Sequence, residues 1–189
     1  MSWMDRFRAA GGTEHDAGPM SATVRGIVKE LDALEPQEAR FVAAFAYILG
    51  RAAASDLTID EAEIRVMENL VGRLGHLPEE LARLVVRIVK HRSSLFGATE
   101  DFVVTREFRE ISTVSQRVEL LHCLFAVSAA DRSISVAEEE TIRRIATELG
   151  FGHAEYIEAR SRYNALREVL RDLPGKRERA DEGSGGGEA

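Results

Sequence analysis

Two stretches of this chain repeat one pattern of residues. The first, AASDLTIDEAE, covers residues 53–63, and the second, SAADRSISVAEEE, covers residues 128–140. In both, an Asp is followed by a hydroxyl residue two positions later, an Ile three positions later and a Glu seven positions later. A Gly lies twelve residues beyond each Glu, at Gly75 and Gly150. The shared spacing predicts an internally duplicated chain.

At an offset of 75 positions the two copies align without a gap. The identical pairs are Leu49/Leu124, Ala54/Ala129, Asp56/Asp131, Ile59/Ile134, Ala62/Ala137, Glu63/Glu138, Leu74/Leu149, Gly75/Gly150 and Glu80/Glu155. Each copy predicts a helix, a tight acidic turn, a second helix ending at Leu-Gly and a third helix. Two units are too few for an open solenoid. We therefore predict repeats at about residues 40–80 and 115–155, packed with pseudo-twofold symmetry.

Apolar residues recur with helical spacing along most of the chain, and the alternation typical of strands is absent. The fold class predicted is all-α, a single compact helical domain of about seven to eight helices. We expect a turn at residues 93–100. The helices are expected at about residues 24–34, 36–54, 60–74, 78–89, 102–111, 114–130, 135–149 and 154–170.

Composition narrows the functional classes. The formal net charge of −7 argues against nucleic acid as a partner, because that affinity comes mainly from Lys and Arg neutralising phosphates. The single cysteine, Cys123, excludes an internal disulfide and favours a reducing compartment. No apolar run is long enough for a transmembrane segment. We expect a flexible leader at 1–20, a helical domain at 21–171 and a disordered tail at 172–189.

Local physical chemistry explains part of the repeated pattern. Asp60 and Ser135 stand where a helix N-cap is expected, and each is followed three residues later by a Glu, as in a capping box. Gly75 and Gly150 suit the left-handed residue that ends a helix. The repeated Asp before each cap is not explained in this way. A turn role and a second, functional role both remain open for it.

The pattern Ala-x-x-Asp-x-x-Ile-x-x-x-Glu resembles the TerB-like domain. An Arg-x-x-Leu-Leu run, Arg117 to Leu121, precedes FAVSAAD in the second copy. Domains of this family occur in tellurite-resistance proteins and at the N-terminus of the membrane-anchored co-chaperone DjlA. The resemblance covers about residues 38–165 and implies a duplicated helical fold tied to bacterial stress and tellurite resistance. It also implies divalent-metal binding by acidic residues of the repeat turns, which here are Asp56, Glu63, Asp131 and Glu138.

Two departures from the family weaken this metal site. Leu57 and Arg132 stand where Gly usually follows the repeated Asp, and both resist the positive φ that Gly tolerates. The charge of Arg132 would also compete with a cation beside Asp131. We therefore expect no required cofactor and at most weak binding of Ca²⁺ or Mg²⁺. The His-Pro-Asp triplet of a J-domain is absent from the sequence.

Other site chemistry finds little support. Neither acidic turn has the ligand spacing of an EF-hand. The sequence also contains no nucleophile elbow, Walker loop or HExxH motif, so we expect that the protein is not an enzyme. His122, which ends an isolated Glu-x-x-His, and the adjacent Cys123 are expected to be core or boundary residues. A basic set on the fourth helix is expected to be a solvated face, with an acidic partner or lipid head groups as the alternative. It consists of Arg83, Arg87, Lys90, His91 and Arg92.

The sequence thus predicts a non-enzymatic interaction module in bacterial stress or tellurite resistance. Its expected partner is another protein, and a membrane-associated partner is one form of this hypothesis. The alternative function is a weak divalent-metal sensor that uses the two acidic turns. We expect a cytoplasmic protein, and the alternative is a peripheral location at the inner face of the membrane.

Overall fold

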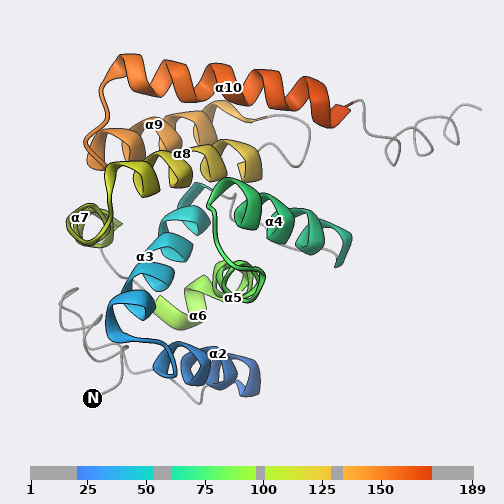
Figure 1. The fold of residues 1–189 in the computed structure, drawn as a ribbon, viewed down its shortest axis with the longest axis vertical. Coiled ribbons are helices and arrows are strands. Elements are labelled where there is room, and N and C mark those ends of the chain that lie inside the picture. Colours follow the sequence, from blue (N-terminus) through green and yellow to red (C-terminus); the bar gives the residue numbers. More distant parts are fainter. Residues whose placement is uncertain (1–20, 53–60, 97–100, 129–133, 172–189) are drawn as a thin grey trace, which may run out of the picture.

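Helices account for all the regular structure that the computed structural model describes, which is residues 21–52, 61–96, 101–128 and 134–171 (Figure 1). They are α2 (Ala22–Asp32), α3 (Pro36–Ala52), α4 (Glu61–Leu74), α5 (Glu79–Lys90), α6 (Arg92–Phe96), α7 (Asp101–Ile111), α8 (Val114–Ser128), α9 (Val136–Glu148) and α10 (His153–Arg171). The prediction of an all-α fold is confirmed. The predicted leader and tail lie outside the described residues, as do both acidic turns.

Two of the described helices, α8 and α9, begin with a reciprocal pair of bonds between capping side chains and backbone N–H groups. In α9 the Glu138 N–H donates to Ser135 Oγ at 3.2 Å, and the Ser135 N–H donates to Glu138 Oε2 at 2.8 Å. Thr113 and Gln116 make the same reciprocal pair of bonds before α8, at 3.2 and 2.9 Å. The predicted capping box is therefore confirmed for α9. Its expected counterpart, Asp60, lies outside the described residues.

Helices α3 and α8 form the centre of the molecule (Figure 1). Helix α3 packs on α5, α7, α8 and α9, while α8 packs on α4, α9 and α10. Ten of the 17 residues of α3 are buried, so this helix contacts neighbours on most sides. The Phe125 ring of α8 contacts two rings of α10, tilted against Tyr156 at a centroid distance of 5.5 Å and stacked on Tyr163 at 6.0 Å. These contacts hold α10 against α8.

The segment expected as a turn at residues 93–100 contains the short helix α6. Leu95 and Phe96 are 3% and 8% exposed, and one helical turn carries both into the core. The Phe96 ring meets Tyr47 edge-on at 5.0 Å. Arg92, expected on a solvated face, instead lies over the Tyr47 ring at 5.1 Å. That prediction is wrong for Arg92, because its backbone has already left α5.

The end of α9 has the predicted glycine geometry. Gly150 has φ +89°, in the left-handed region that an L side chain resists. The Gly150 N–H donates to Thr147 O at 3.0 Å, and the Phe151 N–H donates to Ala146 O at 2.9 Å. These two bonds form a Schellman motif and satisfy carbonyls that the helix leaves free.

The end of α4 is built differently, and the prediction that Gly75 adopts a left-handed conformation is wrong. The residue with positive φ is His76, at +48°, and Gly75 still donates to Val71 O at 2.9 Å. Glycine is required at position 75 by the lack of room for a side chain and not by its backbone conformation. An added Cβ would lie 2.7 Å from Val71 O and 3.2 Å from Phe45 Cζ.

Helix positions agree with the offset of the repeat. Helix α4 begins at Glu61 and α9 at Val136, which are 75 positions apart. The packing is also reciprocal, since α4 lies on α8 and α9 lies on α3. Superposition of the two halves, with Asp56 over Asp131, stays a prediction.

Candidate functional site

The four predicted metal ligands are placed unequally. Asp56 and Asp131 lie outside the described residues, and Glu63 lies on α4 without a described side chain. Glu138 stands in the first turn of α9, where one carboxylate oxygen accepts the Ser135 N–H. Within the described ranges, no three His, Cys, Asp or Glu side chains gather as metal ligands would. The metal site stays a prediction.

The two acidic turns leave the described fold at adjacent points. Ser128, the last residue of α8, donates its hydroxyl to the carbonyl of Ala52, the last residue of α3, at 3.3 Å. Both residues are buried, at 4% and 2% exposure. Asp56 follows Ala52 by four residues, and Asp131 follows Ser128 by three. The described structure therefore joins the starting points of both turns.

A buried arginine fixes one of these helix ends. The Arg51 guanidinium donates to the Glu148 carboxylate at 2.7 and 3.3 Å and to Thr105 Oγ1 at 2.6 Å. Its Nε lies 3.3 Å from Asp101 Oδ2, and the Arg51 side chain is only 4% exposed. These contacts join α3, α7 and α9. Sequence reasoning missed this group, because an Arg in the last turn of a helix is usually a solvated residue.

The pKa of Glu148 reflects this environment. Burial by itself raises the pKa of the carboxyl group, since the charged form loses hydration. Hydrogen bonds from Arg51 and Thr105, with the positive charges of Arg51 and Arg144, outweigh burial and lower the pKa below its ordinary value. The carboxylate is therefore the form that the fold favours.

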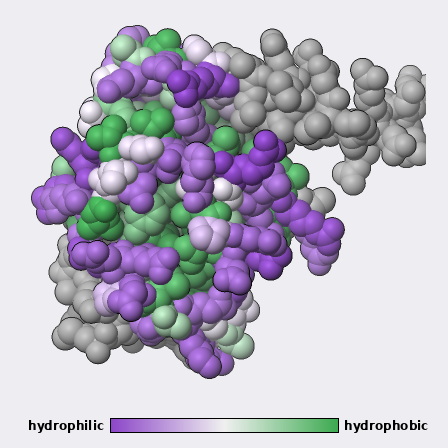
Figure 2. Space-filling view, in the orientation of Figure 1, coloured by the Kyte–Doolittle hydropathy of each residue, from purple (hydrophilic) through white to green (hydrophobic). Residues whose placement is uncertain are grey.

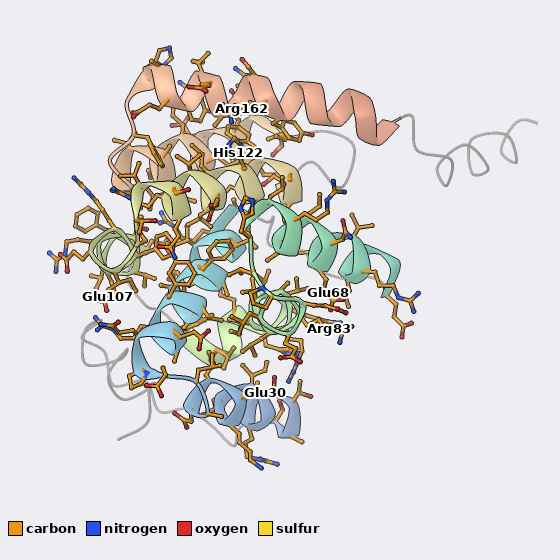
Figure 3. All side chains as sticks on the ribbon, in the orientation of Figure 1. Glu30, Glu68, Arg83, Glu107, His122 and Arg162 are labelled. Carbon is orange, nitrogen blue, oxygen red and sulfur yellow. The ribbon has the colours of Figure 1, made fainter. Side chains whose placement is uncertain are left out.

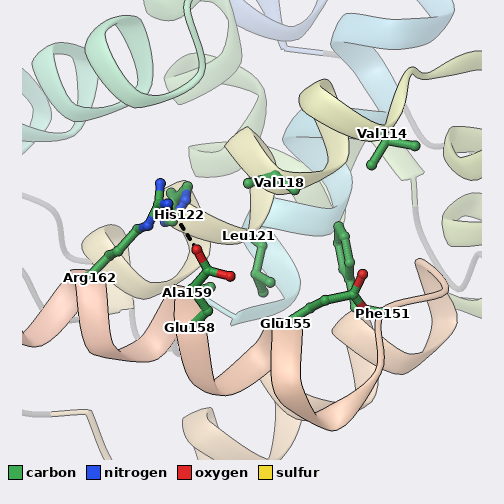
Figure 4. A pocket seen from close by; sticks show the side chains of 9 residues that line it. All are labelled: Val114, Val118, Leu121, His122, Phe151, Glu155, Glu158, Ala159 and Arg162. Carbon is green, nitrogen blue, oxygen red and sulfur yellow. Dashed lines mark hydrogen bonds and ion pairs between the residues drawn. The ribbon is translucent and has the colours of Figure 1, made fainter.

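A groove of about 230 Å³ lies between α8 and α10 (Figure 4). Val114 lies near Phe151 and Glu155 toward one end, and His122 lies near Arg162 at the other. The two helices therefore run in the same direction along the groove. From Val114 to His122 the helical rise gives a length of about 12 Å. The groove is lined by Val114, Val118, Leu121, His122, Phe151, Glu155, Glu158, Ala159 and Arg162.

The groove has an apolar floor and a polar rim. Leu121 and Ala159 are 1% and 4% exposed, whereas Val114 at its open end is 61% exposed. On the rim, Arg162 Nη2 donates to Glu158 Oε1 at 2.9 Å, and Glu155 Oε2 accepts the Gly152 N–H at 2.6 Å. Figure 2, which has the orientation of Figure 1, shows apolar surface exposed between charged side chains.

His122 and Cys123 occupy a boundary and a core position, as expected. His122 lines the groove beside Arg162 (Figure 3). Burial, then the charge of Arg162, lowers the pKa of His122 against the opposing effects of Glu158 and Glu119, so the imidazole is neutral at pH 7. Cys123 is fully buried, and burial followed by the charge of Glu119 raises the pKa of its thiol to about 12.

Two of the basic residues on α5 are engaged in ion pairs. Arg87 contacts both carboxylate oxygens of Glu30 on α2 at 2.8 Å, and Arg83 pairs with Glu79 one turn earlier. Pairing on a partly exposed surface agrees with the expected solvated face. It reduces the positive charge that an acidic partner or lipid head groups would meet.

The spacing of the groove residues on α8 and α10 is the only sequence signal for this site. Apolar residues recur along both helices in the sequence, but which of them stay uncovered depends on tertiary packing. Among the described helices, none combines the length and apolar character needed to cross a membrane.

The described residues form a helical domain with an open groove between two of its helices. Comparison with known families gives a match over residues 41–161 to the family described as tellurite resistance protein TerB, and the chain belongs to this family. No curated protein and no solved structure shows a significant match. Helix α2 precedes the matched region.

Proposed function

We propose that the protein is a non-enzymatic interaction module in bacterial resistance to tellurite or related oxyanion stress. In this proposal it acts in the cytoplasm and binds a protein partner through the groove between α8 and α10. Family membership supports the link to tellurite. The apolar floor of the groove, open at Val114, is the observation that carries the interaction role.

The chemistry of the groove favours binding over catalysis. Arg162 and Glu158 are paired with each other, and Glu155 is bonded to the backbone. His122 is held neutral, and the lining contains no Ser, Cys, Thr or Lys that it could activate as a nucleophile. The apolar floor is therefore the part of the groove that gains most from contact with another molecule.

Complementation of a tellurite-sensitive deletion strain tests this function. Val114→Glu places a charge at the open end of the groove, and Val136→Glu is its matched control. Both valines are the first residues of their helices, and both are exposed, at 61% and 85%. A Glu in the first turn suits either helix dipole, so both variants should fold.

We expect Val136→Glu to restore tellurite resistance fully and Val114→Glu to restore little of it. Thermal unfolding should show that the two variants are equally stable. Full complementation by Val114→Glu would contradict a role for the groove in resistance.

A second candidate function is weak divalent-metal binding by the two acidic turns. The Ser128–Ala52 contact supports it, because both turns start from that point. Glu138 has one oxygen in the capping box, which leaves only its other oxygen for a cation. Leu57 and Arg132 in place of glycines further disfavour a tight site, so we expect millimolar or weaker affinity.

Calorimetric titration with Ca²⁺, Mg²⁺ and Zn²⁺ tests the metal hypothesis. The parent protein would be compared with Asp56→Asn and Asp131→Asn. We expect weak heats that Asp56→Asn reduces more, because Arg132 already disfavours a cation in the second turn. Micromolar binding abolished by either change would make metal sensing the leading function.

A further inference from the structure

The groove between α8 and α10 has a counterpart between α3 and α5. At the repeat offset, its α8 positions fall on α3 and its α10 positions fall on α5. The corresponding pairs are Val114/Ala39, Val118/Ala43, Leu121/Ala46, His122/Tyr47, Glu155/Glu80, Glu158/Arg83, Ala159/Leu84 and Arg162/Arg87. The arginine at one end of the groove is thus present in both halves.

The counterpart surface is covered. Ala39 is 1% exposed where Val114 is 61% exposed, and Tyr47 is 2% exposed where His122 is only half-buried. Helix α2 packs on both α3 and α5, and Phe96 of α6 covers Tyr47. In the first half, two short helices therefore occupy the surface that stays open in the second half.

Helix α2 shows what such an occupant looks like. Three apolar residues of α2 are buried: Val24, Ile27 and Leu31, at 2%, 0% and 0% exposure. They are the first, fourth and eighth residues of an eight-residue stretch. Glu30, directly before the last of them, meets the guanidinium of Arg87 with both oxygens. An amphipathic helix held by such anchors is a common mode of recognition in a groove.

Among the described helices of the second half, none takes this place. Helix α7 precedes α8 as α2 precedes α3, but α7 packs on α3 and α9 (Figure 1). Its buried residues Val104, Thr105 and Phe108 serve that contact, with the Phe108 ring 5.2 Å from Phe41. The groove between α8 and α10 therefore keeps its opening at Val114.

We infer that this groove binds an amphipathic helix of a partner protein that resembles α2. The helix has apolar anchors at its first, fourth and eighth positions and a carboxylate directly before the last anchor. This carboxylate pairs with the guanidinium of Arg162, whose Nη2 also donates to Glu158, as Glu30 pairs with Arg87. From the first to the eighth position it spans about 10.5 Å, which fits a groove of about 12 Å. This inference rests on the proposed function and names the partner's chemistry.

A protein helix fits this site better than a lipid surface does. Glu119, Glu155 and Glu158 lie around the groove against the single guanidinium of Arg162, so anionic head groups would meet net repulsion. A helix such as α2 carries Arg25 and Lys29 besides Glu30, and all three are exposed. Mixed charge of this kind can complement both signs on the rim.

The probe for this inference is a fluorescein-labelled peptide of residues 21–34, bridged between positions 25 and 29 to hold it helical. Fluorescence anisotropy would measure its binding to the full chain. We expect saturable binding that Val114→Glu weakens about tenfold, whereas Val136→Glu leaves it unchanged. An Ile27→Asp peptide, which loses the central anchor, should not bind.

A charge exchange tests the predicted ion pair. A Glu30→Lys peptide should bind the parent protein several-fold more weakly and regain affinity for Arg162→Glu, because the pair is then restored with opposite signs. Amide shifts in a ¹⁵N spectrum should map binding to α8 and α10. Shifts confined to α3 and α5 would mean that the peptide displaces α2, which would overturn the inference.

Three further results would also overturn it: no saturable binding to the parent, equal loss in both valine variants, or no rescue by the charge exchange. The last experiment measures binding to vesicles that contain anionic lipid. If the parent protein binds these vesicles but not the peptide, and Val114→Glu abolishes vesicle binding, the groove would be assigned to a membrane surface. Failure of the peptide experiments leaves the complementation result intact. Failure of complementation alone would refute the proposed role in resistance without refuting the groove's preference for a helix.

Discussion

The second helices of the two repeats, α4 and α9, end at glycines that occupy equivalent positions for different physical reasons. Gly150 is required by backbone conformation, with φ +89° and a Schellman motif. Gly75 is required by packing, since Phe45 and the Val71 carbonyl leave no room for a Cβ. Identical residues at equivalent positions therefore do not establish identical roles.

The asymmetry with the largest expected effect on stability lies at the ends of the central helices. Arg51 of α3 is buried in contact with Glu148, whereas its counterpart on α8 is Ala126. We expect Arg51→Met to lower the free energy of unfolding by about 3 kcal/mol, because the largely buried Glu148 carboxylate then loses its partner. Arg40→Met, which breaks the partly exposed pair with Glu107, should cost less than about 1 kcal/mol.

Chemical denaturation at several pH values checks the Arg51 prediction. The Glu148 pKa is lowered in the folded protein, so its contribution is present at neutral pH and is lost as pH falls through that lowered value. The stability gap between the parent and Arg51→Met should therefore narrow in acid. A gap that stays constant to pH 3 would contradict the assignment to Glu148.

Substitution of Gly75 should produce the next largest effect. We expect Gly75→Ala to cost about 2 kcal/mol through overpacking against Phe45 and the Val71 carbonyl. Gly75→Asn should cost more, because its larger side chain adds further atoms to a site that is already too small for a Cβ. Thermal and denaturant unfolding of the two variants would measure this order, and an Asn variant more stable than the Ala variant would contradict it.

Substitution of Gly150 should reverse that order. Gly150→Ala is expected to cost about 1 kcal/mol because of its positive φ. Gly150→Asn should cost less, since Asn tolerates the left-handed region. The nearest atoms to an added Cβ belong to the Arg109 guanidinium, at 3.1–3.3 Å, and this flexible side chain can move. The same order of Ala and Asn at both glycines would remove the distinction between the two helix ends.

The smallest effect concerns the helix starts, where we expect the halves to agree. Ser135→Ala should cost about 1 kcal/mol by removing the capping bond to Glu138. Asp60→Ala should cost about the same if the first repeat uses the same cap. Thermal melts of both variants would test this, and a loss in Ser135→Ala alone would show that the repeats begin their second helices differently.

The sequence predicted local features well and tertiary ones poorly. The capping box of Ser135 and the helix bounds depend on residues within a few positions, so the pattern contains them. The role of Gly75 depends on Phe45 and Cys123, which are distant in sequence. The groove between α8 and α10 could not be predicted either. It stays open because α7 packs on α3 and α9 and does not cover it. Both acidic turns lie outside the described residues, so the roles expected for them stay predictions.

The burial of Cys123 has a consequence for the chemistry that a tellurite-resistance protein encounters. Oxidants attack thiols mainly as exposed thiolates. Cys123 is the only cysteine of the chain, it is fully buried beside Gly75, and burial raises the pKa of its thiol far above neutral pH. The folded protein therefore exposes no cysteine thiol to an oxidising oxyanion.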